Sequence, residues 1–360
     1  MRLSRRSAVF RTTAGLPHVA VAALAVAGIV AALAASLGAT HPDASGSARI
    51  ARFEDQLFSG DGRALARSRR APSDPLWSQA WSLRALRLPD VWPSASGGAA
   101  TVVAVIDTGV DAGQPDLAGA LVPGYDTLAT GTGTADENGH GTAVAGIIAA
   151  RSDNRVGITS VCGTCSVMPV KVIGASGFGD AAHIATGIVW AADHGARVIN
   201  LSVVLDGPQQ SIADAVRYAH DRGVVVVAAA GNGGAADPTY PAAYPEVIGV
   251  AASQEDGTLY PWSQRGSWVD VAAPGCSPST ARGGDYTIFC GTSSATASVA
   301  GVVALALSAV PTATNVDVER VITQTAVPLR DGGVAFGNVD ALSLVDALRA
   351  SATPGTDLSS

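Results

Sequence analysis

The chain has 360 residues, 48% hydrophobic and 15% charged, which excludes intrinsic disorder for most of its length and allows one large domain or two ordinary ones. Its charge is uneven, because residues 1–70 contain ten arginines and four acidic residues, whereas residues 71–360 contain 13 basic and 26 acidic residues. An acidic body lacks the clustered cations that nucleic-acid binding requires, so no nucleic-acid partner is expected.

The amino terminus has the pattern of an export signal. Four arginines within the first 11 residues precede an apolar run at residues 19–37, and positive charge before such a run is typical of a signal peptide or signal anchor. The run is longer than an ordinary signal core of about 7–15 residues and close to the roughly 20 that span a bilayer. We therefore predict a signal peptide or signal anchor over residues 1–40, with cleavage and retention both open. The remainder is expected outside the cytoplasm, secreted or anchored, with membrane contact only through this segment.

Residues 41–72 are interpreted as a linker or short pro-segment, since Arg, Ser and Gly are frequent there. Residues 73–350 contain no internal repeat and no clear second domain, so they are expected to form one domain. Residues 351–360 are expected to be a flexible tail. We expect the protein to be a monomer.

The body alternates between strand and helix patterns. In chain order, apolar runs and helical spacing predict a strand at 101–106, a buried helix at 141–150, a strand at 167–172, a helix at 181–194, a strand at 197–205, a helix at 212–219, strands at 224–229 and 247–252, and a helix at 294–308. This order predicts an α/β fold with a doubly wound, mostly parallel sheet flanked by helices.

Four short motifs place reactive residue types at the ends of these elements. Asp107 follows the first strand, His140 stands between two glycines before a helix, Asn232 follows the strand at 224–229, and Ser293 begins the last helix. Each residue alone has an ordinary interpretation as a turn, a cap or a structural histidine. Together they supply the carboxylate, imidazole, amide donor and hydroxyl that nucleophilic acyl transfer requires.

With these motifs in this order, the sequence resembles the subtilisin-like serine proteases, or subtilases, and especially their thermitase-like branch. The resemblance covers about residues 74–350 and implies a serine endopeptidase that forms an acyl-enzyme. It implies that Asp107 orients the imidazole, that His140 is the general base and that Ser293 is the nucleophile. The side-chain amide of Asn232 and the backbone N–H of Ser293 would form the oxyanion hole. No organic cofactor is expected.

The resemblance also implies that a peptide or protein substrate binds as an extended strand between two segments. The residues expected to contact it are Gly177, Phe178 and Gly179 on one wall, Ser202, Val203 and Val204 on the other, and Ala229, Ala230 and Gly231 around the residue before the scissile bond. One departure is notable, because Val204 and Leu205 stand where the family has two glycines. It favours a selective processing protease, and it leaves open a catalytically weak binding or scaffold protein on the same fold, or an esterase.

A structural calcium ion is implied by the resemblance alone. The matching side chains are Asp74, Asp116 and Asn154, and oxygen ligands on loops suit this cation. Arg151 and Arg155 place positive charge in the same loop, so a cluster of caps and turns is the alternative.

The four cysteines allow three disulfide pairings, and oxidation is expected in an exported protein. We favour Cys162–Cys165, which would clamp the loop before the strand at 167–172, and Cys276–Cys290, which would brace the segment before the nucleophile. A thioredoxin-like redox role is disfavoured because a strand pattern, not a helix, follows Cys165. Zinc binding is disfavoured because no histidine pair has ligand spacing.

Overall fold

The computed structural model describes residues 71–95, 101–205 and 207–352. The predicted signal segment at 1–40, nearly all of the linker or pro-segment at 41–72, and most of the tail at 351–360 lie outside the described residues.

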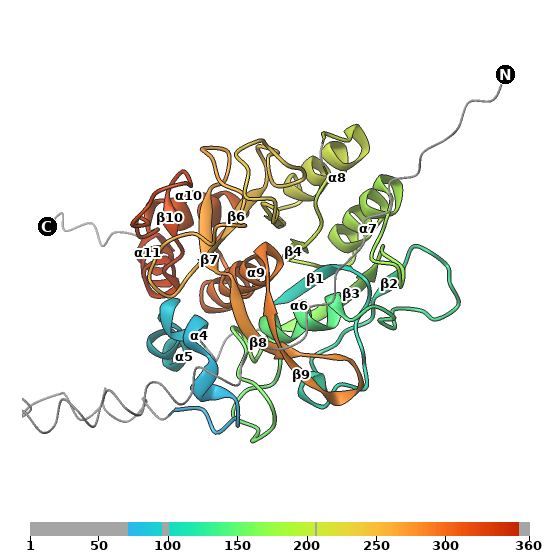
Figure 1. The fold of residues 1–360 in the computed structure, drawn as a ribbon, viewed down its shortest axis with the longest axis horizontal. Helices are drawn as coiled ribbons and strands as arrows, with labels where there is room; N and C mark the ends of the chain where they lie inside the picture. Colours follow the sequence, from blue (N-terminus) through green and yellow to red (C-terminus); the bar gives the residue numbers. More distant parts are fainter. Residues whose placement is uncertain (1–70, 96–100, 206, 353–360) are drawn as a thin grey trace, which may run out of the picture. The chain divides into compact units, whose positions relative to one another are not determined.

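An eight-stranded parallel sheet forms the centre of the domain (Figure 1), in the order β10-β7-β6-β5-β4-β1-β3-β2. Its strands are β1 (Val102–Asp107), β2 (Tyr125–Asp126), β3 (Ser166–Lys171), β4 (Val198–Leu201), β5 (Val225–Ala229), β6 (Ile248–Ser253), β7 (Val271–Pro274) and β10 (Gly337–Asn338). Because β1 pairs with β3 on one side and β4 on the other, the direction of winding reverses beside β1. The predicted doubly wound α/β fold is confirmed.

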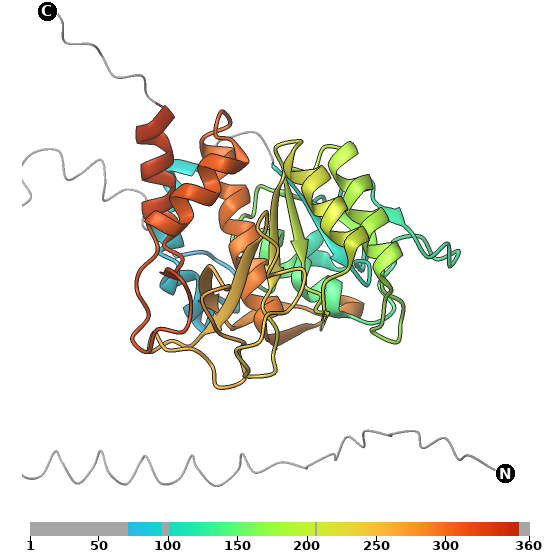
Figure 2. The same cartoon turned by 90° about the horizontal axis from the view of Figure 1, so that it is seen from above.

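Helices cover both faces of this sheet (Figure 2). One face packs against α7 (Ala181–Asp193) and α8 (Gln210–His220), and the other against α6 (His140–Ala149) and α9 (Thr292–Ala309). Successive strand side chains point to opposite faces, so Val103 belongs to the core of α6 and α9 whereas Ala104 belongs to the core of α7 and α8. Strands buried on both faces are apolar throughout, which explains the continuous runs in the sequence.

Smaller elements complete the domain. They are the helices α4 (Trp81–Ala85), α5 (Leu88–Ala95), α10 (Asn315–Gln324) and α11 (Ala341–Ala352), and the short 3-10 helices η2 (Trp77–Gln79), η3 (Pro115–Leu117) and η4 (Arg282–Gly284). Of these, α5 and α11 pack against α9.

Helix α9 is buried almost from end to end. It lies close to its neighbours, since a Cβ on Gly301 would lie only 2.7 Å from Cβ of Val161. Among the described residues, α9 is the one helix that is long and apolar enough to cross a bilayer. Its burial within the domain identifies it as a core helix instead.

An antiparallel hairpin that the sequence patterns did not predict leads into α9. It consists of β8 (Cys276–Thr280) and β9 (Tyr286–Cys290), and its ends are joined by the Cys276–Cys290 disulfide. The hairpin therefore braces the segment directly before Ser293, as the predicted pairing implied.

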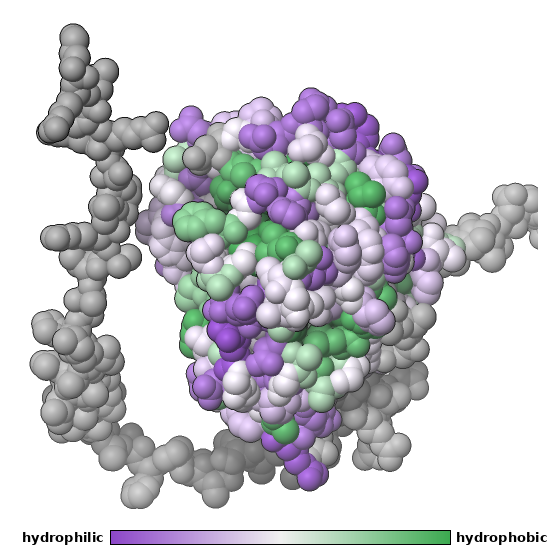
Figure 3. Space-filling view, turned by 90° about the vertical axis from the view of Figure 1, so that its right-hand side faces the viewer, coloured by the Kyte–Doolittle hydropathy of each residue, from purple (hydrophilic) through white to green (hydrophobic). Residues whose placement is uncertain are grey.

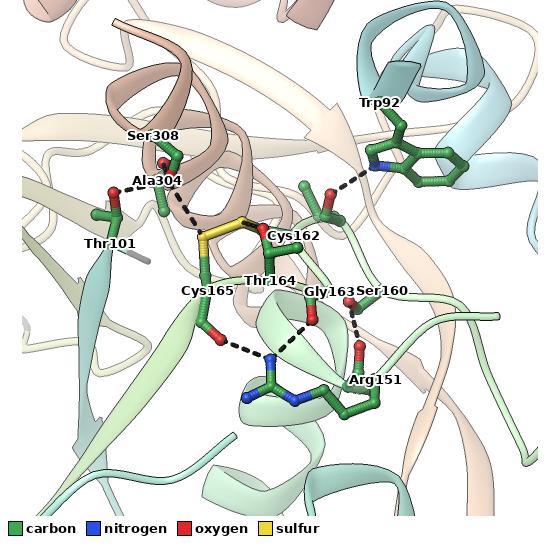
Figure 4. The surroundings of a disulfide bond; sticks show 12 residues. Trp92, Thr101, Arg151, Ser160, Cys162, Gly163, Thr164, Cys165, Ala304 and Ser308 are labelled. Carbon is green, nitrogen blue, oxygen red and sulfur yellow. Dashed lines mark hydrogen bonds between the residues drawn. A yellow bond between two sulfur atoms is a disulfide. The ribbon is translucent and has the colours of Figure 1, made fainter. Parts of the chain in front are cut away.

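The second disulfide, Cys162–Cys165, closes a turn just before β3 (Figure 4). Both cysteines are fully buried, and Sγ of Cys165 lies 3.9 Å from Oγ of Ser308 in α9. The guanidinium of Arg151 donates to the carbonyl oxygens of Gly163 at 2.7 Å and Cys165 at 3.0 Å. Both predicted pairings are confirmed, and the burial of this one suits a structural clamp.

One predicted strand was too long. The apolar run at 197–205 predicted a single strand, but β4 ends at Leu201. The following residues leave the sheet, and Leu205 instead forms an isolated antiparallel bridge with Tyr240. Val203 and Val204 are as hydrophobic as residues of a buried strand. The sequence pattern therefore could not reveal that the segment leaves the sheet where the neighbouring strand β1 ends.

The molecular surface in Figure 3 carries hydrophobic residues in separate patches among hydrophilic ones. Small scattered patches are usual on monomeric proteins. The expected monomer stays a prediction.

Candidate active site

Three side chains from distant parts of the chain form one line of hydrogen bonds. Nδ1 of His140 lies 2.8 Å from Oδ1 and 2.9 Å from Oδ2 of Asp107, and Nε2 of His140 lies 3.2 Å from Oγ of Ser293. Asp107 is the last residue of β1, His140 the first of α6 and Ser293 the second of α9. Asp107 is fully buried and Ser293 is 8% exposed, whereas His140 is half-buried. The structure thus brings the predicted carboxylate, imidazole and hydroxyl together.

A glycine lets α6 approach the end of β1. A Cβ on Gly141 would lie 2.2 Å from the carbonyl oxygen of Gly109 and 3.2 Å from Oδ1 of Asp107. No side chain fits in that space, so only glycine permits His140 to reach the carboxylate from the first turn of the helix.

A second buried carboxylate, Asp136, holds the turn before His140, and the sequence analysis missed it. Its Oδ1 accepts hydrogen bonds from Thr108 Oγ1 at 2.8 Å and from the N–H of Gly139 at 2.7 Å. Its Oδ2 accepts from the N–H of Thr142 at 3.0 Å and from its hydroxyl at 2.6 Å. The only local signal was an aspartate before an Asn-Gly pair, which is common in turns.

Two carboxylates set the charge state of His140. Burial by itself lowers the pKa of the imidazole, but the charge of Asp107, its hydrogen bond and the charge of Asp136 raise it. The net pKa of His140 lies above the ordinary value of 6.5.

Asn232 is held with its amide group free for a ligand. Its Oδ1 accepts hydrogen bonds from the N–H of Thr292 at 2.9 Å and from the Thr292 hydroxyl at 3.1 Å. That hydroxyl oxygen accepts in turn from the N–H of Gly231 at 3.1 Å. Asn232 is exposed, and its Nδ2, which makes no hydrogen bond to another described residue, lies beside the start of α9, where helical N–H groups lack partners. The sequence analysis did not identify Thr292, whose role depends on this contact.

A cleft of about 430 Å³ passes along His140, Asn232 and Ser293. The predicted substrate-binding residues that line it are Gly177, Phe178, Gly179, Ser202, Val203 and Val204. Phe178 is 84% exposed on one wall. The three residues predicted around the residue before the scissile bond, Ala229, Ala230 and Gly231, are buried and do not line this cleft.

The predicted calcium ligands also come together. Asp74 accepts hydrogen bonds from the N–H groups of Asp153 at 2.9 Å and Asn154 at 3.0 Å. Asp116 accepts from Nδ2 of Asn154 at 2.9 Å and from the N–H of Ile158 at 2.8 Å. Both carboxylates are buried, and neither forms an ion pair with a basic side chain of the described residues.

Comparisons with known proteins show the family of this chain. The sequence profile of the subtilase family matches residues 98–343. Thermitase from Thermoactinomyces vulgaris is 40% identical over 278 residues, which cover 76% of this chain and 99% of thermitase. The chain belongs to the subtilase family. By that membership it is a serine-type endopeptidase, and the predicted family is confirmed.

Two further relatives of this subtilase are informative. A thermophilic serine proteinase from Bacillus sp. (strain AK1) is 41% identical over 246 residues, and the match covers 68% of this chain and 61% of that proteinase. A solved protease from Pseudoalteromonas arctica PAMC 21717 superimposes with a TM-score of 0.71 at 30% identity, over 78% of this chain and all of that one.

We expect the His140 imidazole of this subtilase to titrate above pH 6.5, measured by NMR of the histidine side chains. Asp107→Asn removes the negative charge beside the imidazole and replaces the charged acceptor of its Nδ1 hydrogen bond with a neutral amide, so the pKa of His140 should fall. Asp136→Asn should lower it less, because Asp136 raises the pKa of His140 through its charge and makes no hydrogen bond to the imidazole. Amide spectra would verify that each variant is folded. A pKa at or below the ordinary value in the unsubstituted protein would contradict this account.

Proposed function

We propose that this subtilase hydrolyses peptide bonds through an acyl-enzyme, with Asp107, His140 and Ser293 as its catalytic triad. The observation that carries the proposal is the continuous hydrogen-bond line from the buried carboxylate through the imidazole to the serine hydroxyl. This line ends in a cleft large enough for a peptide segment.

The proposed reaction has two halves. Oγ of Ser293 attacks the carbonyl carbon of the substrate while Nε2 of His140 takes the hydroxyl proton. His140 then gives that proton to the leaving amine as the C–N bond breaks, which leaves an ester on Ser293. Water, deprotonated by the same imidazole, attacks the ester carbon; the C–O bond to Ser293 breaks, the acid is released, and His140 returns the proton to Oγ of Ser293. Because the base must be neutral, activity falls as the pH drops through the raised pKa of His140.

Negative charge on the substrate oxygen would be stabilised by Nδ2 of Asn232 and the backbone N–H of Ser293. Support comes from Thr292, whose N–H and hydroxyl fix the Asn232 oxygen and so direct its amide hydrogens elsewhere. A donor held in place before the reaction needs no reorganisation when the charge develops.

We infer that the substrate is an extended peptide lying between the wall of Gly177, Phe178 and Gly179 and the wall of Ser202, Val203 and Val204. Both walls line one cleft with Ser293, which supports this binding mode. The bulky Val204 favours selective processing over broad digestion. Export is supported by the two disulfides, which persist outside the cytoplasm, together with the basic and apolar amino terminus.

A calcium ion is proposed to bind Asp74, Asp116 and Asn154. In this structure Nδ2 of Asn154 faces Asp116 and its Oδ1 accepts from the N–H of Val156 at 2.7 Å, so the amide would turn over to offer its oxygen to the ion. Burial raises the pKa of Asp116, its hydrogen bonds from Ile158 and Asn154 lower it, and the charge of Asp74 raises it further, with a net upward shift. Two buried carboxylates without a cationic side chain are costly, and a bound cation would offset that cost. The ion would stabilise the loop and take no part in the reaction.

Ser293→Ala should abolish labelling by a fluorophosphonate probe and lower kcat by about 10⁶-fold, the order found for the equivalent change in subtilisin. Ser294→Ala is the matched control, because the neighbouring hydroxyl is fully buried and lies outside the cleft. It should still be labelled. A folded unsubstituted protein that is neither labelled nor active would favour the scaffold alternative.

Asn232→Ala should lower kcat by about 10²–10³-fold with little change in KM, as the equivalent change does in subtilisin. The reason is that the amide contacts the substrate oxygen strongly only in the transition state. Steady-state kinetics on enzyme counted by fluorophosphonate labelling provide the measurement. An effect confined to KM would show that Asn232 acts in binding alone.

Calcium should raise the melting temperature, and a chelator should reverse the rise. A calcium concentration 100-fold above Kd stabilises the fold by about 2.7 kcal/mol, which corresponds to several degrees. Asp116→Asn should remove this response, and magnesium at the same concentration should produce little of it, because Mg²⁺ demands a tighter octahedral site. Identical melting curves with calcium and with chelator would rule the site out.

A further inference from the structure

Two neighbouring segments leave the sheet side by side at the cleft. Strands β4 and β5 pair in register up to Leu201 and Ala228. Beyond this pair run residues 202–205 on one side and residues 229–232 on the other. The resemblance to subtilases implies that the substrate side chain before the scissile bond enters between these segments, although in this structure only Asn232 of the second segment lines the cleft.

Val204 spans the gap between them. Its Cγ1 lies 3.6 Å from the position that a Cβ on Gly231 would occupy. The real Cα of Gly231 is about 1.5 Å farther away at most, so it lies within about 5 Å of Cγ1. A substrate carbon in contact with both atoms would need about 7–8 Å, since contacting carbons lie about 3.5–4.0 Å apart, so no substrate atom fits between Val204 and Gly231. Cγ2 of Thr239, at 3.8 Å, and Cγ of Gln264, at 3.0 Å, surround the same position.

Hydrogen bonds hold both segments in place. Leu205 and Tyr240 exchange two backbone hydrogen bonds, with N to O distances of 2.7 and 3.0 Å. The N–H of Gly231 donates to Thr292 Oγ1 at 3.1 Å, and its carbonyl accepts from the N–H of Gln264 at 2.9 Å. Widening the gap would break these bonds, so a large substrate side chain cannot simply push the walls apart.

Val204 is 43% exposed and lines the cleft. Among the described residues that line this cleft, His140 is the only one with an ionisable side chain. The remaining lining residues are apolar or neutral, with Ile173, Phe178 and Ile184 providing the larger apolar surfaces. A charged substrate side chain would therefore lose its hydration here without gaining a partner.

We propose that Val204 makes this subtilase selective for peptides with a small, uncharged residue, Gly, Ala or Ser, immediately before the scissile bond. This inference rests on the proposed peptide hydrolysis and names its substrate class. The position of Val204 also explains why Ser293 lines the cleft whereas Ala229, Ala230 and Gly231, which lie behind the valine, do not.

The test uses three chromogenic peptides that differ only in the residue before the scissile bond, which is Ala, Leu or Phe. We expect kcat/KM to be about 10²-fold higher or more for Ala than for Phe, because steric exclusion from a pocket is worth at least as much as a missing methylene contact. Val204→Gly should raise the Phe to Ala ratio by about 10-fold or more. Val204→Ala should also raise the Phe to Ala ratio. If the glycine variant does not fold, the alanine variant provides the test.

Val316→Ala is the matched control, since Val316 is an exposed valine on α10, outside the cleft. It should leave the ratio unchanged. Labelling by a fluorophosphonate probe reports the nucleophile without occupying this pocket with a side chain. Labelled enzyme that cleaves Phe and Ala peptides equally, or a ratio that Val204→Ala does not alter, would overturn the inference alone. Absence of both labelling and cleavage would overturn the proposed function and the inference together.

Discussion

The buried negative charge of Asp107 is the interaction on which the rest of the site depends. A carboxylate with no exposed surface is costly unless it is paired and hydrogen-bonded. Here the imidazole of His140 and the N–H of Thr108 satisfy it. The same contact orients the imidazole toward Ser293 and raises the pKa of His140. One unfavourable burial therefore orients the proposed base and, together with the charge of Asp136, raises its pKa.

The parallel sheet determines where this charge lies. Winding reverses beside β1, and in open α/β sheets the carboxyl edge at such a point is where ligands bind. Asp107 ends β1, the segment with Val204 follows β4, and Asn232 follows β5. Helix α9 adds Ser293 from its first turn. The fold thus gathers the site at one edge, although His140 and Ser293 are 153 residues apart.

Loops at this edge are held by further buried polar groups. The ammonium of Lys171, at the end of β3 and fully buried, donates to Glu137 at 2.7 Å and to the carbonyl of Ala135 at 2.9 Å. These bonds secure the turn that contains Asp136, which in turn holds the start of α6. Rigid support of this kind keeps the reacting groups within hydrogen-bond distance before a substrate arrives. The segments around Val204 are held by other bonds, the Leu205–Tyr240 backbone pair and the hydrogen bonds of Gly231.

Local patterns were enough to predict the alternation of strands and helices and to single out Asp107, His140, Asn232 and Ser293. Apolar periodicity and short motifs act over a few positions, so they can be recognised without a partner. Tertiary structure alone decided that the strand at 197–205 ends at Leu201, that β8 and β9 form a hairpin, and that Thr292 and Asp136 hold the site. Those features depend on contacts between residues far apart in the chain. A valine has the same hydrophobicity in a core strand as in the wall of a cleft, so its identity alone does not show which position it occupies.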